Sequence, residues 1–339
     1  MMAMQLDRIV SVDTCDEPLR QVDTPRPVPD VDQIRIAVST CGVCHTELDE
    51  IEGRAAPPKL PVIPGHEVVG RVESIGASVT RFSPGDRVGV GWIYSSDGSE
   101  NENLCDAFRA TGRDANGGYA EFMTVSEKYS FPIPDQISDV QAAPLLCAGA
   151  IGYRALRLCG LIDGKRLGLT GFGASAHIVL QLARYLYPES EVYVFARDAD
   201  TRKFASELGA DWVGTTESRA PSKLDAIIDT TPAWTPVVHA MANLAPGGRL
   251  VINAIRKEDG DKSVLTGISY HDHLWMEREI KSVANITSRD IAEFLPLAAS
   301  IPIHSEIRTY SLADANKALV SLKRKSLRGA NVLVVQQSS

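Results

Sequence analysis

Hydrophobic and polar residues alternate along much of the first third of the chain. Residues 33–40, QIRIAVST, place Ile34, Ile36 and Val38 on one side of an extended backbone, which is the period of a half-buried β-strand. Further strands are predicted at residues 67–76, 86–94 and 117–126. The tripeptides PGH at 64–66 and PGD at 84–86 predict turns. This part of the chain is therefore expected to be β-rich.

The pattern changes after about residue 150. A short apolar strand at 166–170 is followed by a stretch, 171–187, in which Ile178, Leu182 and Tyr185 have helical spacing. Strands are predicted at 191–196, 224–230 and 247–255, with a helix at 236–244 and a last helix and strand within 311–335. Strands that alternate with helices in this way favour an α/β fold with a parallel sheet.

Length and composition favour two domains in one globular protein. The chain has 339 residues, of which 44% are hydrophobic and 23% charged. Its net charge of -8 disfavours a nucleic-acid partner or an anionic membrane surface, because phosphates would be repelled. No apolar run is long enough to span a bilayer, and the first residues lack the layout of a signal peptide. We therefore expect a cytoplasmic protein whose six cysteines are thiols or metal ligands.

A glycine-containing loop follows the strand at 166–170. The sequence Gly171-Phe172-Gly173-Ala174-Ser175-Ala176 lies between a predicted strand and a predicted helix, where a dinucleotide fingerprint belongs. Gly171 allows a tight turn, and Gly173 lets the backbone approach a pyrophosphate that the helix N-terminus stabilises. Ala176 is a small residue at the third position. The loop predicts cofactor contacts from Gly171, Gly173 and Ala174, although an ordinary glycine turn has the same pattern.

The end of the next strand bears on which cofactor is bound. An NAD enzyme usually has an acid here that hydrogen-bonds the ribose 2′-OH. This chain has Ala196 followed by Arg197, and a guanidinium can bind a 2′-phosphate. NADP(H) is therefore favoured over NAD(H), although Asp198 and Asp200 follow closely and could supply an acid.

The segment CGVCHTELDE contains Cys41 and Cys44, three residues apart. A structural zinc site usually repeats such a pair, and the chain has no second Cys-x-x-Cys. A redox pair would begin a helix in a small βαβ fold, whereas this pair follows a strand. The remaining candidate ligands, His66 and Cys147, are distant in sequence. Three separated N and S ligands that leave one position open are typical of a catalytic zinc site.

Five segments together resemble the zinc-dependent alcohol dehydrogenases of the medium-chain dehydrogenase/reductase superfamily. They are CGVCHTELDEIEG, LPVIPGHEVVGRVESIGASVTRFSPGDRVGVGW, NGGYAEFMTV, APLLCAGAIGYRAL and GFGASAH, in that order over nearly the whole chain. The resemblance implies that Cys44, His66 and Cys147 are the zinc ligands and that Cys41 is a thiol with no required role. It also implies that zinc acts as a Lewis acid on the substrate oxygen while hydride passes to a nicotinamide.

The resemblance implies roles for residues beside the ligands. Thr46 matches the hydroxyl that accepts the alcohol proton, and Glu47 matches the carboxylate that orients the zinc-ligating histidine. Glu67 matches an acid that can approach the metal. His45 matches a position that can contact the cofactor pyrophosphate.

The chain departs from the family around the substrate. Many relatives carry a histidine as the outer proton-relay member where this chain has Glu52, so proton release is expected through Glu52 or water. Trp92 matches a pocket wall, Ala55 stands where some relatives have a second tryptophan, and Ile151 replaces a threonine near the nicotinamide. The missing indole predicts substrates larger than ethanol.

The chain also departs from the family at the position of a second zinc. Many family members hold a structural zinc with four cysteines after the Gly-Trp segment. Here Asp97, Glu100 and Asn103 stand where three cysteines would be, and Cys105 remains. This ligand set suits a tetrahedral sulfur site poorly, so we expect one zinc per chain.

The fold implied is a GroES-like β-rich catalytic domain at 1–150, a doubly wound Rossmann domain at 151–286 and a C-terminal segment at 287–339 that completes the catalytic domain. The implied reaction is reversible oxidation of an alcohol to an aldehyde or ketone, with a small-molecule alcohol or carbonyl compound as substrate. A homodimer or homotetramer is expected, with Rossmann sheets paired near residues 281–288. Two alternatives are a zinc-free quinone or enoyl reductase of the same superfamily and a catalytically silent NADPH-binding protein.

Overall fold

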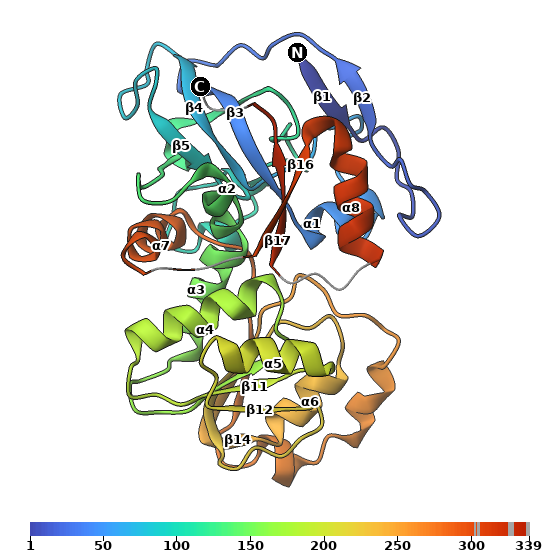
Figure 1. Ribbon diagram of the computed structural model, residues 1–339, viewed down its shortest axis with the longest axis vertical. Coiled ribbons are helices and arrows are strands. Elements are labelled where there is room, and N and C mark those ends of the chain that lie inside the picture. The colour runs from blue at the N-terminus through green and yellow to red at the C-terminus, as the bar shows by residue number, and fades with distance from the viewer. Residues whose placement is uncertain (302, 304–305, 325–328, 337–339) are drawn as a thin grey trace. The chain divides into compact units, whose positions relative to one another are not determined.

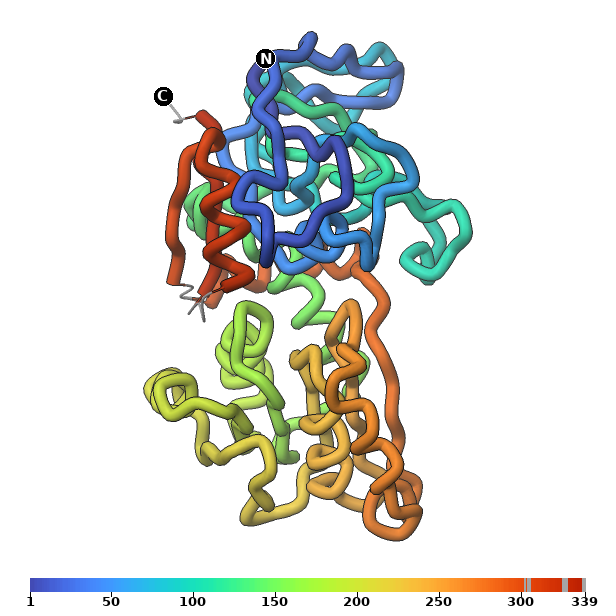
Figure 2. Tube along the Cα trace, turned by 90° about the vertical axis from the view of Figure 1, so that its right-hand side faces the viewer, coloured from blue at the N-terminus to red at the C-terminus, as the bar shows by residue number. Residues whose placement is uncertain are grey.

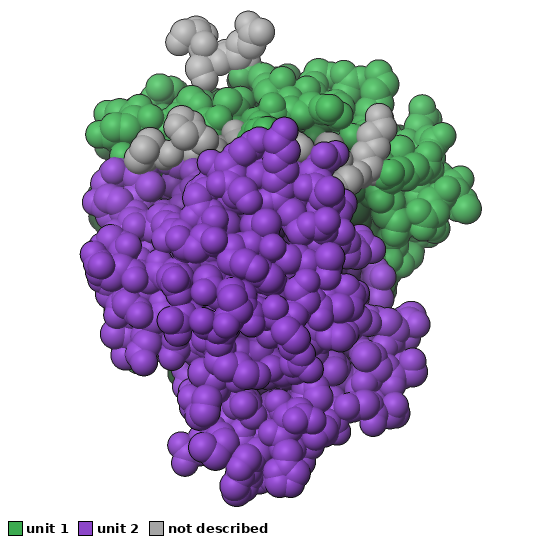
Figure 3. Space-filling view, turned by 60° about the horizontal axis from the view of Figure 1, so that its bottom comes forward, with its two compact units in different colours: residues 1–150, 286–299, 306–339 green, residues 151–285, 300–305 purple. Residues whose placement is uncertain are grey.

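The computed structural model describes residues 1–301, 303, 306–324 and 329–336, so the C-terminal segment expected at 287–339 is described only in part. The chain divides into two compact units, coloured separately in Figure 3. The first unit contains Met1–Ala150, Ile286–Ala299 and Glu306–Ser339, and the second contains Ile151–Asn285 and Ser300–Ser305. None of the described helices has the length and apolar character that crossing a bilayer requires.

The first unit is built on a seven-stranded, mostly antiparallel sheet (Figure 1). Its strands, in spatial order, are β16 (Ile307–Ser311), β17 (Ala330–Val334), β3 (Gln33–Val43), β4 (Val68–Ile75), β5 (Arg87–Val90) and β9 (Phe131–Pro132), while β8 (Phe122–Ser126) also pairs with β3. The alternation seen at 33–40 corresponds to β3, whose Ile34, Ile36 and Val38 are fully buried. β3 runs on to Val43, so it delivers Cys44 at its end.

Smaller elements complete the first unit. They are the paired strands β1 (Met2–Gln5) and β2 (Arg20–Asp23), the paired strands β6 (Ile93–Ser95) and β7 (Arg109–Ala110), and the helices α1 (His45–Ile51), α2 (Asp139–Ala142), α7 (Ser288–Ser300) and α8 (Ala315–Arg324). Helix α8, red in Figure 2, lies beside the blue N-terminal segment. Asn316 exchanges two hydrogen bonds of 2.9 Å with the backbone of Leu19, which joins the two ends of the chain in one unit.

The single strand predicted at 86–94 is divided in the structure. β5 ends at Val90, and β6 begins at Ile93 and pairs with β7 instead of the large sheet. Gly91 lies between them, and a Cβ there would come within 2.7 Å of Ile291 Cδ1 and 3.0 Å of the Leu146 carbonyl oxygen. The backbone therefore leaves the sheet at a position where only glycine fits, and the alternation of residue types does not reveal this.

The second unit is a six-stranded parallel sheet with helical connections. In spatial order its strands are β12 (Trp212–Gly214), β11 (Val192–Phe195), β10 (Leu167–Thr170), β13 (Leu224–Asp229), β14 (Leu244–Ile252) and β15 (Glu279–Ser282), with helices α3 (Ala148–Cys159), α4 (Ala174–Leu186), α5 (Ala199–Glu207) and α6 (Thr235–Met241). This is the doubly wound Rossmann order, with the first strand in the middle of the sheet. The predicted α/β fold class is confirmed.

Helix α5 has no counterpart among the sequence-based predictions. Ala205 is its one buried residue, so its nine residues carry no apolar stripe that periodicity could detect. Its start is marked instead by Asp198, whose side chain accepts a hydrogen bond from the Thr201 N–H at 2.7 Å. This cap is a local signal that a search for apolar periodicity does not detect.

Candidate metal centre and dinucleotide loop

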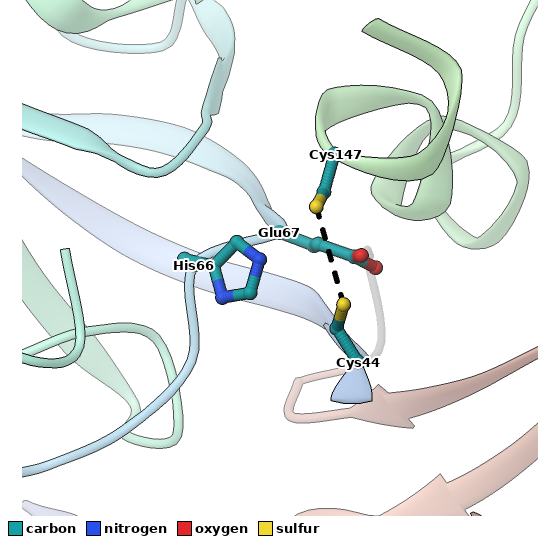
Figure 4. A group of neighbouring side chains, drawn as sticks. All are labelled: Cys44, His66, Glu67 and Cys147. Atoms are coloured by element: carbon teal, nitrogen blue, oxygen red, sulfur yellow. Dashed lines mark hydrogen bonds between the residues drawn. The ribbon is translucent and has the colours of Figure 1, made fainter. Parts of the chain in front are cut away.

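Four side chains from distant parts of the chain meet in the first unit. One potential ligand atom from each of Cys44, His66, Glu67 and Cys147 lies within 4.8 Å of all the others. Figure 4 shows these side chains, with a dashed line between the two sulfur atoms. Among the described residues this is the one group of His, Cys, Asp and Glu side chains with the spacing of a metal site. The structure therefore brings the three sequence-predicted ligands together and adds Glu67.

The local backbone explains how the ligands converge. Cys44 follows β3 as the N-cap residue of α1, and His66 follows Gly65 in the predicted PGH turn. Gly65 has φ +99°, and a Cβ there would lie 2.4 Å from the Tyr119 ring and 2.9 Å from Cys41 Sγ. Only glycine can make this turn, because both the conformation and the space exclude a side chain.

The donor set fits a tetrahedral zinc ion. The sulfur atoms of Cys44 and Cys147 are 4.0 Å apart, close to the separation of about 3.8 Å that two Zn–S bonds require at a tetrahedral angle. His66 is fully buried, and its Nε2 has no hydrogen-bond partner. A buried polar atom without a partner is costly, and a metal ion would satisfy it. The two thiols and the imidazole are also the ligand types that zinc prefers.

Proton sharing in the group shifts several pKa values. The hydrogen bond from Cys147 lowers the pKa of the Cys44 thiol, and the same bond raises the pKa of Cys147. Burial opposes protonation of His66, but the nearby Glu47 carboxylate raises the pKa of the ring above its usual value. Burial, followed by the charge of Cys44, raises the pKa of Glu67. A bound cation would compete with these protons for the same ligand atoms.

Glu47 and Thr46 border the ligands. Glu47 Oε1 lies 2.5 Å from His66 Nδ1, and its Oε2 accepts the backbone N–H of Cys44 at 2.8 Å. Glu47 thus holds the imidazole by one nitrogen and leaves Nε2 available for a metal. The Thr46 hydroxyl lies 3.6 Å from Cys44 Sγ and is buried.

Glu67 lies over the backbone of the Cys-x-x-Cys segment. A Cβ on Gly42 would come within 1.6 Å of Glu67 Oε2, so the carboxylate occupies the space that a side chain would fill. The backbone N–H of Gly42 also donates to the Glu67 carbonyl at 2.9 Å. The glycine between the two cysteines is therefore required for Glu67 to approach the metal ligands.

Three other predicted residues lie in different surroundings. Cys41 is fully buried on β3, and it does not belong to the metal group. His45 is exposed at the first position of α1. Glu52 accepts the Val12 N–H at 3.0 Å and forms ion pairs with Arg54 and Lys323.

The expected pocket residues divide between the two units. Trp92 packs against His66, with ring centroids 6.1 Å apart, and meets Phe108 edge-on at 5.9 Å. Ala55 is half-buried in the same unit, where its carbonyl accepts a hydrogen bond from Arg113. Ile151 is half-buried at the start of the second unit.

A hydrogen-bond network holds the lobe that contains Asp97, Glu100, Asn103 and Cys105. Glu102 is 4% exposed, and its two oxygens accept the Ser96 hydroxyl at 2.6 Å and the Ser288 N–H at 2.5 Å. The Ser96 hydroxyl also lies 2.9 Å from the Tyr129 hydroxyl. A buried carboxylate thus ties the lobe to β6 and α7.

The glycine loop of the second unit has the geometry of a dinucleotide fingerprint. Gly171 follows β10 with φ +76°, and a Cβ there would lie 2.9 Å from both Thr230 Oγ1 and Thr231 Cγ2. Gly173 precedes α4, and a Cβ there would meet no described atom within 4 Å. Protein packing therefore requires glycine at Gly171 but leaves open space at Gly173, beside the N–H groups of the α4 N-terminus. Ala174 is the first residue of α4.

The segment that follows β11 contains an exposed arginine, Arg197, and an aspartate, Asp198, whose carboxylate is already hydrogen-bonded within the protein. Ala196 is buried and Arg197 is exposed. Both Asp198 oxygens accept hydrogen bonds of 2.7 Å from Thr201, one from its N–H and one from its hydroxyl. These bonds lower the pKa of Asp198, with the hydroxyl contributing most.

Three residues near these sites were absent from the sequence-based predictions. Glu50 is 1% exposed on α1 and neither of its oxygens has a hydrogen-bond partner, Phe108 packs on Trp92, and Lys257 is buried beside Asp229. Glu50 could have been inferred, because it lies one helical turn after Glu47. Phe108 and Lys257 are in loops whose placement depends on tertiary structure.

Comparisons with known proteins identify relatives over the whole chain. Residues 30–135 match the alcohol dehydrogenase GroES-like domain. The chain is 40% identical to a probable alcohol dehydrogenase, AdhA, of Mycobacterium tuberculosis, covering 99% of this chain and 97% of that protein. It is 32% identical to a probable cinnamyl alcohol dehydrogenase 8A of Oryza sativa, covering 89% and 88%. A solved cinnamyl alcohol dehydrogenase from Sorghum bicolor is similar with a TM-score of 0.82 at 25% identity, covering 98% and 97%.

Proposed function

Because the chain belongs to the medium-chain alcohol dehydrogenases and catalyses reversible oxidation of an alcohol with a nicotinamide cofactor, we propose that it does so with one zinc ion per chain, held by Cys44, His66 and Cys147. The observation that carries this proposal is the buried His66 Nε2, which lacks a partner and lies among two thiols. Zinc-free quinone or enoyl reduction and a silent binding role would leave this costly arrangement without a purpose.

The residues around the ligands have separate roles in the proposal. When bound, zinc supplies a Lewis acid that polarises the substrate oxygen. Thr46 accepts the alcohol proton, a role that its hydroxyl beside Cys44 supports. Glu47 orients His66, and Glu67 supplies a carboxylate that can approach the metal.

We propose that the dinucleotide binds at the Gly171–Gly173 loop and that NADP(H) is preferred. The open space over Gly173 leaves room for a pyrophosphate beside the start of α4. Arg197 can pair with a 2′-phosphate, and Asp198 is engaged by Thr201, so it is poorly placed to accept a bond from a ribose 2′-OH. His45 is a further candidate for contact with the pyrophosphate.

The preferred substrates are proposed to be larger than ethanol. Ala55 replaces a bulky side chain, while Trp92 and Phe108 offer an aromatic wall beside His66. Cinnamyl alcohol is therefore a suitable first probe, beside ethanol and branched alcohols. If ethanol gave the highest kcat/KM of such a panel, the enlarged pocket would be wrong.

Metal content and turnover test the central proposal. Protein purified without added zinc is expected to contain about one zinc per chain and to reduce aldehydes with NADPH. Cys147→Ala is expected to lose that zinc and at least about a thousandfold in kcat. Cys105→Ala is the matched control, because Cys105 lies in the lobe where relatives hold a second zinc.

The control separates the possible failures. Two zincs in the wild type, with one lost in Cys105→Ala, would show that the lobe binds metal. Zinc and turnover that survive in Cys147→Ala would overturn the assigned ligands. Wild-type protein without zinc and without turnover on any aldehyde would overturn the proposed function as a whole.

A further inference from the structure

A buried ion pair lies at the carboxyl end of the parallel sheet, next to the glycine loop. Asp229 ends β13 and is fully buried, and its carboxylate pairs with the ammonium group of Lys257. The Lys257 side chain is 8% exposed. A pair this deep is costly to desolvate, so it persists only where its other hydrogen bonds are satisfied.

Asp229 joins the ends of two neighbouring strands. Its Oδ1 accepts the hydroxyl of Thr170, the last residue of β10, at 2.6 Å and the hydroxyl of Thr231 at 2.8 Å. Thr230 donates its N–H at 2.9 Å and its hydroxyl at 3.1 Å to the Thr170 carbonyl. Gly171 follows directly and packs against Thr230 and Thr231. The glycine loop is therefore held against the segment that follows β13.

Lys257 also binds the backbone of the segment that follows β13. Beyond Asp229, its ammonium donates to the carbonyls of Thr231 at 2.7 Å and Ala233 at 3.0 Å. A lysine has three N–H donors, and all three are used, so none remains for a phosphate. Lys257 thus acts on the protein itself and is not a direct ligand of the cofactor.

The end of β14 belongs to the same assembly. The Asn253 backbone N–H donates to the Asp229 carbonyl at 2.7 Å, and its side-chain amide donates to Ser175 Oγ at 3.2 Å. Ser175 lies in the first turn of α4. The ends of β10, β13 and β14 and the start of α4 are therefore connected by one set of buried and partly buried polar contacts.

The position of this network within the sheet suggests its purpose. The strand order reverses between β10 and β13, and ligands of doubly wound sheets bind outside the carboxyl ends of the strands at this point. We propose that Lys257 is a positioning residue that sets cofactor affinity by holding the segment 229–233 against the Gly171 loop. The inference rests on the proposed binding of the dinucleotide at that loop.

Cofactor binding by purified variants tests the inference. The dissociation constant for NADPH is measured by fluorescence well below the unfolding temperature, together with kcat at saturating NADPH. Lys257→Met is expected to weaken NADPH binding about tenfold or more while kcat at saturation stays within about threefold, because no reacting group is touched. Lys257→Arg keeps the charge and several donors, and is expected to bind NADPH close to the wild-type value.

A double variant separates positioning from stability. Lys257→Met leaves a buried carboxylate without a counter-ion, so its melting temperature is expected to fall. Asp229→Asn with Lys257→Met removes both charges and should recover most of that loss, yet its NADPH binding should remain weak. If Lys257→Met alone does not fold, the double variant carries the test. The exposed Lys203 on α5, paired with Glu207, supplies the control variant Lys203→Met, which should change neither quantity.

Two outcomes would overturn the inference. One is a folded Lys257→Met that binds NADPH as tightly as the wild type, and the other is a double variant that recovers affinity and melting temperature together. Wild-type protein that binds neither NADPH nor NADH would instead overturn the proposed cofactor site, so the two failures are distinguishable.

Discussion

We propose that one exposed side chain, Arg197, sets the preference for NADP(H). It stands at the end of β11 beside an acid that is already engaged by Thr201. A charge-assisted contact to a 2′-phosphate contributes about 1.5–3 kcal/mol, which corresponds to roughly tenfold to a hundredfold in affinity. The proposed cofactor preference therefore depends on an exposed residue that contributes little to the fold.

Arg197→Ala is expected to raise the KM for NADP(H) by about tenfold to a hundredfold and to leave that for NAD(H) within about threefold. Steady-state kinetics with both cofactors measure this. Lys203→Ala, a nearby cation that is 75% exposed, is the control and should change neither KM. Equal effects on NADP(H) and NAD(H) would show that Arg197 does not contact the 2′-phosphate.

Glu52, one candidate for the outer proton relay, forms ion pairs with Arg54 and Lys323. Burial opposes its ionisation, but hydrogen bonds from Lys323 and Arg54 lower the carboxyl pKa below its ordinary 4.5. A carboxyl with a depressed folded-state pKa stabilises the protein above its unfolded pKa, and that contribution is lost as the pH falls through the folded value. Glu52 is therefore expected to make stability sensitive to acid.

Glu52→Gln is expected to lower the free energy of unfolding by about 1–2 kcal/mol at pH 7. The difference from wild type should shrink as the pH falls from about 5 towards 3. Denaturant unfolding at several pH values measures it. The pH profile of kcat, measured where both proteins are folded, tests the relay separately. A changed profile in Glu52→Gln supports proton release through Glu52, and an unchanged profile favours release through water.

At the scale of elements, a hydrogen-bond network holds the lobe that contains Asp97, Glu100, Asn103 and Cys105. Glu102, in the short helix η1 (Glu102–Leu104), holds β6 through Ser96 and the start of α7 through Ser288. Buried hydrogen bonds to a charged group contribute about 1.5–3 kcal/mol each. These hydrogen bonds are therefore expected to stabilise the lobe.

Glu102→Ala is expected to lower the free energy of unfolding by about 2–4 kcal/mol, because the partners of a buried carboxylate lose their acceptor. Thermal unfolding and limited proteolysis within residues 96–105 measure the effect. Glu100→Ala, an exposed position in the same lobe, should be nearly neutral. A stable Glu102→Ala protein would show that other contacts hold the lobe.

At the scale of the whole molecule, β15 is one of the two edge strands of the six-stranded sheet, and β12 is the other. All four residues of β15 are exposed, and Ile280 is 44% exposed. An exposed edge strand with an apolar side chain is a template for pairing with a second chain. We therefore propose that two copies pair their β15 strands, which fits the expected interface near residues 281–288.

Ile280→Glu is expected to weaken the dimer at least about tenfold, because it adds a charge beside Glu279 at the paired edge. Light scattering coupled to size-exclusion chromatography over a range of concentrations measures the mass. Ile162→Glu, at another exposed apolar position of the same unit, is the control. A wild-type monomer, or a dimer unaffected by Ile280→Glu, would refute pairing at β15.

Much of the architecture followed from local patterns. The alternation at 33–40 corresponds to β3, and the strand and helix pattern after residue 150 predicted the parallel sheet, because burial imposes periods of 2 and 3.6 residues on the sequence. The break at Gly91 and helix α5 could not be predicted this way. At Gly91 the side chain of Ile291, from a remote helix, lies where a Cβ would be crowded, and α5 buries too little apolar surface to leave a pattern.

The sequence by itself determined the fold class and was sufficient to nominate the proposed metal ligands, because motifs such as GHE and GFG record constraints on a few adjacent residues. Tertiary structure alone decided that Cys44 and Cys147, over a hundred residues apart, lie with their sulfur atoms 4.0 Å from each other. It also decided that Glu102 holds the lobe and that Lys257 pairs with Asp229. These contacts join segments that are distant in sequence, and their energies depend on burial and on the number of satisfied hydrogen bonds, which exist only in the folded chain.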